Sequence, residues 1–131
     1  MDSGRVLVVD DEVYNCEVLR AIIMKLGVKD PANRLTLCTD PEEALEKYKE
    51  CFKDKERAYR VVFTDLCMPE MDGYELTRRI RQLTIDEESE PMIAALTGHT
   101  ETEFFKKALE VGCNLVYPKP INSQQIKTVL E

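Results

Sequence analysis

The sequence predicts an α/β fold, a doubly wound five-stranded parallel sheet with helices on both faces. Short apolar runs alternate with helical patterns along all 131 residues. That alternation is typical of parallel strands joined by right-handed crossovers. The apolar runs are also continuous, as expected of strands that are covered on both faces. The length fits one domain, residues 1–131, and 44% hydrophobic residues suffice for a core.

Five apolar runs are expected to form the strands. They lie at residues 6–9, 35–38, 61–63, 92–96 and 115–117. The third strand is expected to end at Asp65. We expect the strand order 2-1-3-4-5 of flavodoxin-like sheets, in which sites form beyond the carboxyl ends of the strands.

Five helices are expected to follow these strands. The first begins at Val13, where apolar residues start to recur on one helical face, and stops near Gly27. The last has Ile121 and Ile126 placed as a hydrophobic staple. Capping boxes predict where four helices start, because a polar side chain and an acid or amide three residues later satisfy backbone N–H groups. The predicted boxes pair Asp40 with Glu43, Asp72 with Glu75, Thr100 with Glu103 and Asn122 with Gln125.

The composition excludes several classes of protein. With 25 acidic against 18 basic residues and a formal net charge of −7, the chain lacks the basic surface that binds DNA or RNA. No apolar run reaches the roughly 18 residues of a membrane span, and no secretory signal is present. We therefore expect a cytoplasmic domain without membrane contact. No CxxC pair occurs, so the cysteines are interpreted as reduced thiols that fill the core. They are Cys16, Cys38, Cys51, Cys67 and Cys113.

Chemically active side chains gather where the predicted strands end. Asp10 and Asp11 follow the first strand, Asp65 ends the third, Thr97 follows the fourth and Lys119 follows the fifth. In the order 2-1-3-4-5 the first and third strands are neighbours, so the three carboxylates crowd together at one edge of the sheet. The spacing therefore predicts one shared site.

Three carboxylates packed closely repel one another, and a hard divalent cation resolves that conflict. Magnesium prefers a few carboxylates, a carbonyl oxygen and several waters. A carboxylate held beside magnesium, a lysine and a hydroxyl is placed to act as a nucleophile on phosphorus, because the cations stabilise the transferring oxygens. Taken singly, the residues have simpler interpretations. Asp10 and Asp11 could open a helix, and Lys119 could be a surface lysine.

Four motifs together resemble the receiver (response-regulator) domain of two-component signalling, and the resemblance covers essentially the whole chain. Each motif alone is weak, but all four occur in order, each at a strand end. They are VVDDE at residues 8–12, DLCMPEMDG at 65–73, LTG at 96–98 and KPI at 119–121.

The resemblance implies a role for each acidic residue. Asp65 resembles the phosphoacceptor, which takes a phosphoryl group from a phosphohistidine. Asp11 and Asp65, with the backbone carbonyl of Cys67, resemble the magnesium ligands, and Asp10 resembles the acid that acts on the metal through water. The implied partner is a histidine kinase or a histidine phosphotransfer protein. A receiver of this kind is a switch module and not a turnover enzyme.

The resemblance also implies a conformational switch, with one departure. Thr97 resembles the switch hydroxyl, Lys119 resembles the lysine paired with the phosphoryl group, and the bond before Pro120 is expected to be cis. The family's switch aromatic sits three residues before the lysine, where this chain has Val116. Tyr117 is one residue later and points to the opposite face. We therefore expect coupling to pass mainly through the backbone after Thr97, with Tyr117 keeping one rotamer.

Other functions fit the sequence less well. A haloacid-dehalogenase-type phosphatase needs a second acid two residues after the nucleophile, where this chain has Cys67. A flavodoxin-type electron carrier would place a phosphate beside residues 10–12, whose charges repel it. The D-x-D-x-D-G pattern of a calcium loop is lacking. His99 is interpreted as solvent-facing. The context stays open between a hybrid histidine kinase, a free-standing receiver and a regulator with an output domain.

Overall fold

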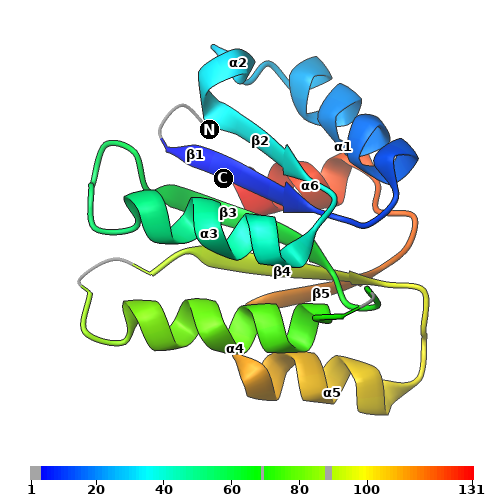
Figure 1. The fold of residues 1–131 in the computed structure, drawn as a ribbon. Helices are drawn as coiled ribbons and strands as arrows, with labels where there is room; N and C mark the ends of the chain where they lie inside the picture. Colours follow the sequence, from blue (N-terminus) through cyan, green and yellow to red (C-terminus); the bar gives the residue numbers. More distant parts are fainter. Residues whose placement is uncertain (1–3, 69, 88–89) are drawn as a thin grey trace.

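The computed structural model describes residues 4–68, 70–87 and 90–131. Pro69, part of the motif at 65–73, lies outside the described residues. The sheet has five parallel strands in the order β2-β1-β3-β4-β5, which confirms the predicted topology (Figure 1). The strands are β1 (Arg5–Val9), β2 (Leu35–Cys38), β3 (Tyr59–Asp65), β4 (Met92–Thr97) and β5 (Leu115–Pro118). β1 pairs with both β2 and β3, so the ends of β1 and β3 lie side by side.

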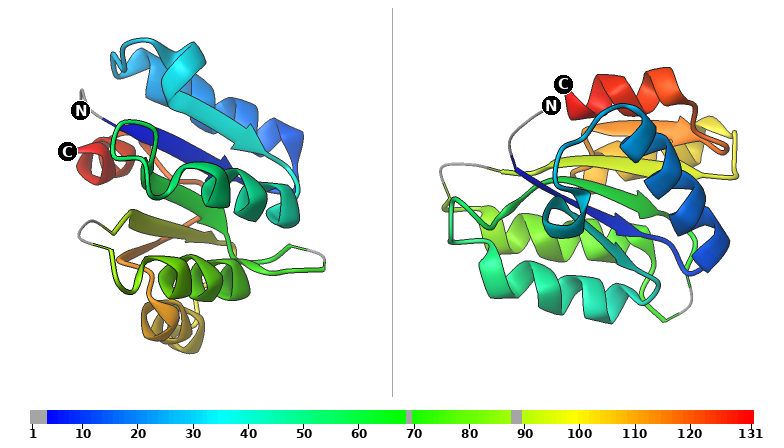
Figure 2. Two further views of the ribbon diagram at one scale, coloured as in Figure 1. Left: turned by 60° about the vertical axis from the view of Figure 1, so that its left-hand side comes forward. Right: turned by 90° about the horizontal axis from the view of Figure 1, so that it is seen from above.

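The helices cover both faces of the sheet, as predicted. The right-hand view of Figure 2 shows α3 and α4 on one side of the sheet and α6 on the other. Contacts join α3 to α4 and α4 to α5 in one layer, and α1 to α6 in the other. The helices are α1 (Val13–Lys25), α2 (Pro31–Arg34), α3 (Pro41–Cys51), α4 (Gly73–Thr84), α5 (Thr102–Val111) and α6 (Ser123–Leu130).

The short helix α2 was not predicted. It forms a single turn with a proline in its first turn and no buried residue, so it lacks the apolar periodicity that reveals a helix in a sequence. Asp30, its N-cap residue, has a left-handed backbone. α2 lies in the connection to β2 and takes no part in the site.

Only one of the four predicted capping boxes is formed in full. Asn122 and Gln125 form the full box at α6. At α4 half of the predicted box forms: the Asp72 carboxylate accepts from the Glu75 backbone N–H, while the Glu75 carboxylate accepts from Arg78 and Arg79. The Asp40 carboxylate instead accepts from the backbone N–H of residue 42, at 3.0 Å. The box at Thr100 is wrong, because α5 begins at Thr102 with Glu101 as its N-cap residue, and no side chain caps it.

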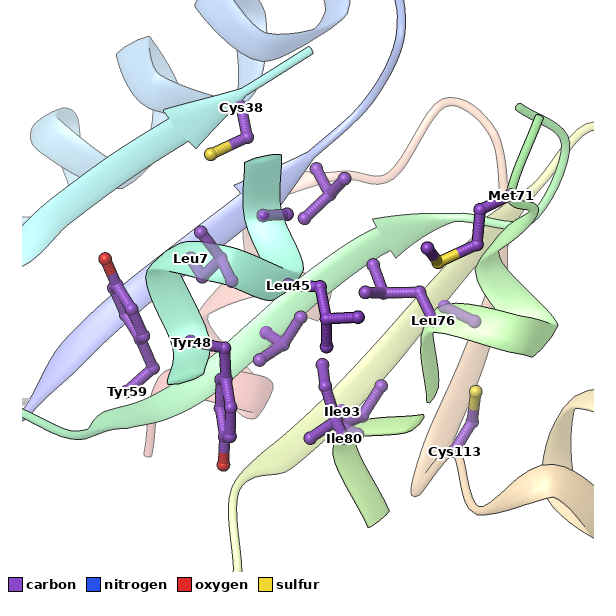
Figure 3. Close-up of a cluster of buried hydrophobic side chains, with 14 of the residues drawn as sticks. Leu7, Cys38, Leu45, Tyr48, Tyr59, Met71, Leu76, Ile80, Ile93 and Cys113 are labelled. Carbon is purple, nitrogen blue, oxygen red and sulfur yellow. The ribbon is translucent and has the colours of Figure 1, made fainter. Parts of the chain in front are cut away.

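Each face of the sheet carries its own apolar core. Successive strand residues point to opposite faces, so Leu7 packs in one core with α3, α4 and α5, and Val8 packs in the other with α1 and α6. Figure 3 shows the first core, in which Leu45, Leu76 and Ile93 meet between the helices and the sheet. On β5, Val116 packs against the first core and Tyr117 against the second, as the strand alternation predicts.

The cysteine interpretation holds for four of the five thiols. They are buried, whereas Cys67 is exposed in the loop after β3. Burial raises the pKa of Cys16 to about 11 and that of Cys38 to about 12. These thiols stay protonated at neutral pH and fill space in the core.

The start of α4 passes unusually close to the end of β3. The backbone N–H of Gly73 donates to the carbonyl of Leu66 at 3.1 Å. A Cβ at residue 73 would overlap the backbone oxygen of Asp65 and lie 2.9 Å from Leu66 Cα. Only glycine permits this approach. The start of α4 therefore holds the backbone at Asp65 in place.

Gly73→Ala is expected to lower the free energy of unfolding by roughly 1–3 kcal/mol, because the added methyl group fits only if the backbone moves. Urea denaturation measures this loss. Gly98→Ala is the matched control, because a Cβ at residue 98 meets no atom within 4 Å. An equal loss of stability in both variants would contradict the prediction.

Candidate functional site

The predicted site residues converge at the carboxyl edge of the sheet, as the strand order requires. Asp10 directly follows β1, Asp65 is the last residue of β3 and Thr97 is the last residue of β4. Lys119 directly follows Pro118 at the end of β5. Four separate strand ends therefore supply one group of side chains.

The three carboxylates form a compact acidic cluster. One oxygen each from Asp10, Asp11 and Asp65 lies within 4.8 Å of the others. Asp10 and Asp65 are 4% and 5% exposed, and Asp11 is exposed. The cluster thus opens to solvent on the Asp11 side, where a small cation can enter.

Backbone hydrogen bonds orient the two buried carboxylates. Asp10 Oδ1 accepts from Glu12 N–H at 3.0 Å, and Asp65 Oδ1 accepts from Cys67 N–H at 3.2 Å. Both bonds join a carboxylate to an amide two residues later, as in a turn. Each leaves the second carboxylate oxygen available to other partners.

Lys119 supplies the positive charge at the centre of the site. Its Nζ lies 3.2 Å from Asp65 Oδ2 and 3.4 Å from Asp10 Oδ2. Burial acts to lower the pKa of Lys119, but the carboxylates of Asp65 and Asp10 outweigh it, so the pKa is raised. The ammonium group therefore stays charged at neutral pH.

The pKa of Asp65 is raised even though Lys119 lies beside its carboxylate. Burial of its carboxylate raises the pKa. The Lys119 ammonium and the Cys67 N–H act in the opposite direction, and the charge on Asp10 adds to the increase. One lysine thus compensates incompletely for burial and for the neighbouring acid. Further positive charge at this edge would stabilise the ionised carboxylate.

The donor set fits a hard divalent cation. It consists of carboxylate oxygens, and the exposed Asp11 lets water reach a bound ion. One lysine lies beside the three acids, so the cluster keeps an excess of negative charge. Magnesium is bound in this way, by a few carboxylates and retained waters. Asp10, Asp11 and Asp65 can hold such an ion, and the carbonyl of Cys67 as a further ligand stays a prediction.

Thr97 lies at the same edge with its hydroxyl already hydrogen-bonded. The residue is 1% exposed, and its Oγ1 accepts from the backbone N–H of His99 at 3.0 Å. Its carbonyl accepts from the backbone N–H of Lys119 at 2.8 Å, which ties β4 to the loop that carries the lysine. The Lys119–Pro120 bond is cis, as the resemblance implied.

His99 is solvent-exposed, as interpreted from the sequence, but it also makes contacts that sequence reasoning missed. Its ring stacks on Phe104 with centroids 4.2 Å apart, and its Nδ1 lies 3.9 Å from a Glu101 carboxylate oxygen. The stack joins residues five apart, a spacing outside the usual neighbour rules for a helix. No pattern in the sequence pointed to it.

The fold and the site together define a phosphoacceptor module of two-component signalling. Residues 6–131 match the response regulator receiver domain, and the chain belongs to that family. It is a receiver domain and not a standalone enzyme. The acidic cluster is typical of the magnesium-binding phosphoaspartate site, which favours this function over the phosphatase, electron-carrier and calcium-loop alternatives.

Several of the similar proteins are histidine kinases or their receiver domains. The osmosensing histidine protein kinase SLN1 of Saccharomyces cerevisiae is 34% identical over 128 residues, which cover 98% of this chain and 10% of the kinase. The receiver domain of the Arabidopsis thaliana histidine kinase CKI1, solved with Mg²⁺, has a TM-score of 0.85 at 29% identity. That match covers 99% of this chain and 91% of the other. The same domain with Mg²⁺ and BeF₃⁻ has a TM-score of 0.83 at 28% identity, over 97% and 89% of the two chains.

The chain spans only 7% to 12% of the length of the curated relatives that it matches. Across residues 4–68, 70–87 and 90–131, no helix combines the length and the apolar character needed to cross a membrane.

Asp65→Asn is expected to raise the urea midpoint of unfolding at pH 7.5 in the presence of a chelator. Folding raises the pKa of Asp65, so the folded chain holds this proton more tightly than the unfolded chain. The protonated group therefore favours folding, and that contribution is lost as the pH rises through the raised pKa. Asparagine does not ionise and avoids this loss.

The advantage of the asparagine variant should shrink as the pH falls toward the ordinary aspartate value of 3.8. Paired denaturation curves between pH 4 and pH 8 measure the difference. A variant that is less stable than the parent at pH 7.5 would contradict the prediction.

Proposed function

We propose that Asp65 accepts a phosphoryl group from a phosphohistidine and that residues 1–131 act as a single receiver domain. The observation that carries this proposal is the buried Asp65 carboxylate, with Lys119 Nζ at 3.2 Å and oxygens of Asp10 and Asp11 within 4.8 Å. The donor is a histidine kinase or a histidine phosphotransfer protein. Phosphorylation then changes the conformation of the domain.

In the proposed transfer, an Asp65 carboxylate oxygen attacks the phosphorus atom of the phosphohistidine. A new O–P bond forms, the P–N bond breaks, and the histidine nitrogen keeps the electron pair and takes up a proton. Asp10, Asp11, Asp65 and the Cys67 carbonyl would hold Mg²⁺. When bound, the ion supplies positive charge opposite the phosphoryl oxygens and offsets the repulsion between donor and acids.

Two other residues act on the phosphoryl group. Lys119, held by the carboxylates of Asp10 and Asp65, is positioned to neutralise a phosphoryl oxygen during transfer and afterwards. Thr97 can turn its hydroxyl from the His99 N–H toward that oxygen, which stabilises the phosphorylated conformation selectively.

The surface beside the site suits a protein donor. Tyr14 and Val18 on α1 are 76% and 40% exposed, although both are large apolar residues. They line a cavity of about 260 Å³ that also borders Asp10 and Lys119. A donor whose histidine reaches Asp65 must cover this edge of the sheet. We therefore place the donor's contact surface on α1 and the loop that follows β5.

The wider context is also part of the proposal. Curated relatives of this chain are histidine kinases many times longer than it, so a parent kinase or an output domain belongs to the function that we propose. We place the domain in the cytoplasm, where kinase donors and ATP are available, and we expect no nucleic acid partner.

Acetyl phosphate with Mg²⁺ is expected to add one phosphoryl group, labile to hydroxylamine, at Asp65. Asp65→Asn should abolish the label, because the amide cannot act as the nucleophile, and chelation of Mg²⁺ should suppress it in the parent chain. Intact-mass spectrometry measures the added group. Retention of full labelling in Asp65→Asn would remove Asp65 as the acceptor.

Replacing both Tyr14 and Val18 with serine is expected to slow phosphotransfer from a histidine phosphotransfer protein by about tenfold, equivalent to about 1.4 kcal/mol. Labelling by acetyl phosphate should stay unchanged, because this small donor needs no docking surface. Leu109→Ser on α5 is the matched control, since Leu109 is also an exposed apolar residue, at 53%.

The two donors separate docking from chemistry. If the double variant loses acetyl phosphate labelling as well, the change has damaged the site itself. If transfer from the protein donor is unchanged while Leu109→Ser slows it, the donor binds on the α5 side instead.

A further inference from the structure

His99 contacts the region of the phosphoacceptor site through its backbone and helix α5 through its side chain. Its backbone N–H donates to Thr97 Oγ1 at 3.0 Å, directly beside the phosphoacceptor site. Its ring stacks on Phe104 in the first turn of α5, with centroids 4.2 Å apart and ring planes 14° from parallel. One residue therefore spans the distance from the switch hydroxyl to a helix.

We propose that His99 transmits the state of Thr97 to α5 and takes the place of the switch aromatic that this chain lacks at Val116. This inference rests on the proposed function, because it requires a phosphoryl group on Asp65. When the Thr97 hydroxyl turns to that group, the His99 N–H loses its acceptor. The loop at 98–101 then relaxes, and the stack on Phe104 changes.

The geometry at Thr97 makes the two hydrogen bonds alternatives. Staggered χ1 rotamers lie about 120° apart, so a rotation that brings Oγ1 to a new partner carries it away from the old one. Thr97 is almost fully buried at 1% exposure, so its hydroxyl turns between partners that the fold supplies, and the His99 N–H must find a new acceptor when Oγ1 turns away. The backbone after Thr97 must therefore respond to the change of rotamer.

The contacts beyond Phe104 carry the change to a second helix. The backbone carbonyl of Phe104 accepts from the hydroxyl of Tyr74 on α4 at 3.4 Å. Lys107 on α5 places its ammonium group 4.3 Å from the centre of the Tyr74 ring. A shift of Phe104 thus alters the contact between α4 and α5, and we assign the output surface to these two helices.

Tyr117 and Val116 lie away from this route. Tyr117 packs against the core shared by α1 and α6, on the other face of the sheet from α4 and α5. Val116 faces the α4 and α5 side but is short and rigid about χ1. Neither residue provides a ring that can move between the site and α5, whereas His99 already holds one there.

NMR spectroscopy tests this relay with little ambiguity, because His99 is the only histidine in the chain. Its ring protons give one isolated set of imidazole signals. In the resting chain, the Phe104 ring should shift these signals, and Phe104→Leu should remove that shift. Phe105→Leu is the matched control, since Phe105 is the neighbouring aromatic on α5 and takes no part in the stack.

The decisive comparison adds Mg²⁺ and beryllofluoride at constant pH to the parent chain and to Thr97→Ala. Bound fluoride, observed by ¹⁹F NMR, reports occupancy of the site independently. We expect the imidazole signals of the parent chain to move on binding. In Thr97→Ala the concentration of the mimic is raised until ¹⁹F NMR reports the same occupancy as in the parent chain, and the imidazole signals should then stay where they are.

The alternative outcomes are distinct. Bound fluoride with unmoved imidazole signals in the parent chain overturns the relay and leaves the proposed function intact. A full imidazole shift in Thr97→Ala also overturns it, because the signal would then bypass the hydroxyl. Absence of bound fluoride in the parent chain would defeat the proposed function and the relay together.

Discussion

The Lys119 ammonium group lies between two buried carboxylates, 3.2 Å from Asp65 and 3.4 Å from Asp10, and the rest of the site depends on that arrangement. Without this charge, two buried acids would face each other at the neighbouring ends of β1 and β3 with no opposing charge, and loss of the lysine would therefore be strongly destabilising. The lysine also ties the loop after β5 to strands β1 and β3. It therefore holds the edge of the sheet together and prepares that edge for an anionic group.

The charge of Lys119 compensates only partly for the burial of the Asp65 carboxylate. Burial keeps the pKa of Asp65 raised although Lys119 lies against it, so the ionised carboxylate is held at a cost in stability. A divalent cation and then a phosphoryl group change that balance of charge. Such ligands would act strongly on this site, because its charges lie in a region that water screens poorly. Strain of this electrostatic kind is characteristic of functional sites.

The carboxyl edge of the sheet is bordered by α1 on one side and by the loop leading to α5 on the other. On one side, α1 presents exposed apolar residues and a cavity that borders the site. On the other, His99 and Phe104 lead from Thr97 to α5 and, through Tyr74, to α4. In the function and relay that we propose, a donor is received on one side of the site while the conformational change is delivered on the other. Under that proposal the input and output surfaces are separate, and neither covers the other.

The sequence by itself determined the fold class, the strand order and the identity of the clustered acids. Continuous apolar runs indicate buried strands, and in a doubly wound sheet their carboxyl ends must meet at one edge. The capping box of Asn122 with Gln125 was equally readable, because both partners are local in sequence. The single turn of α2 escaped prediction because it buries no residue, and the start of α5 was misplaced because the loop at 98–101 is held by contacts rather than by a local pattern.

Only the tertiary structure decided how the clustered groups are arranged. Lys119 and Asp10 are 109 positions apart, so no local pattern states that the ammonium group bridges two carboxylates or that burial outweighs it at Asp65. The need for glycine at residue 73 follows from the passage of α4 against the end of β3, which the strand and helix patterns do not specify. The stack of His99 on Phe104 likewise depends on the path of a loop. Periodicity and capping report local backbone preferences, whereas distances, burial and ring contacts arise only when distant segments pack together.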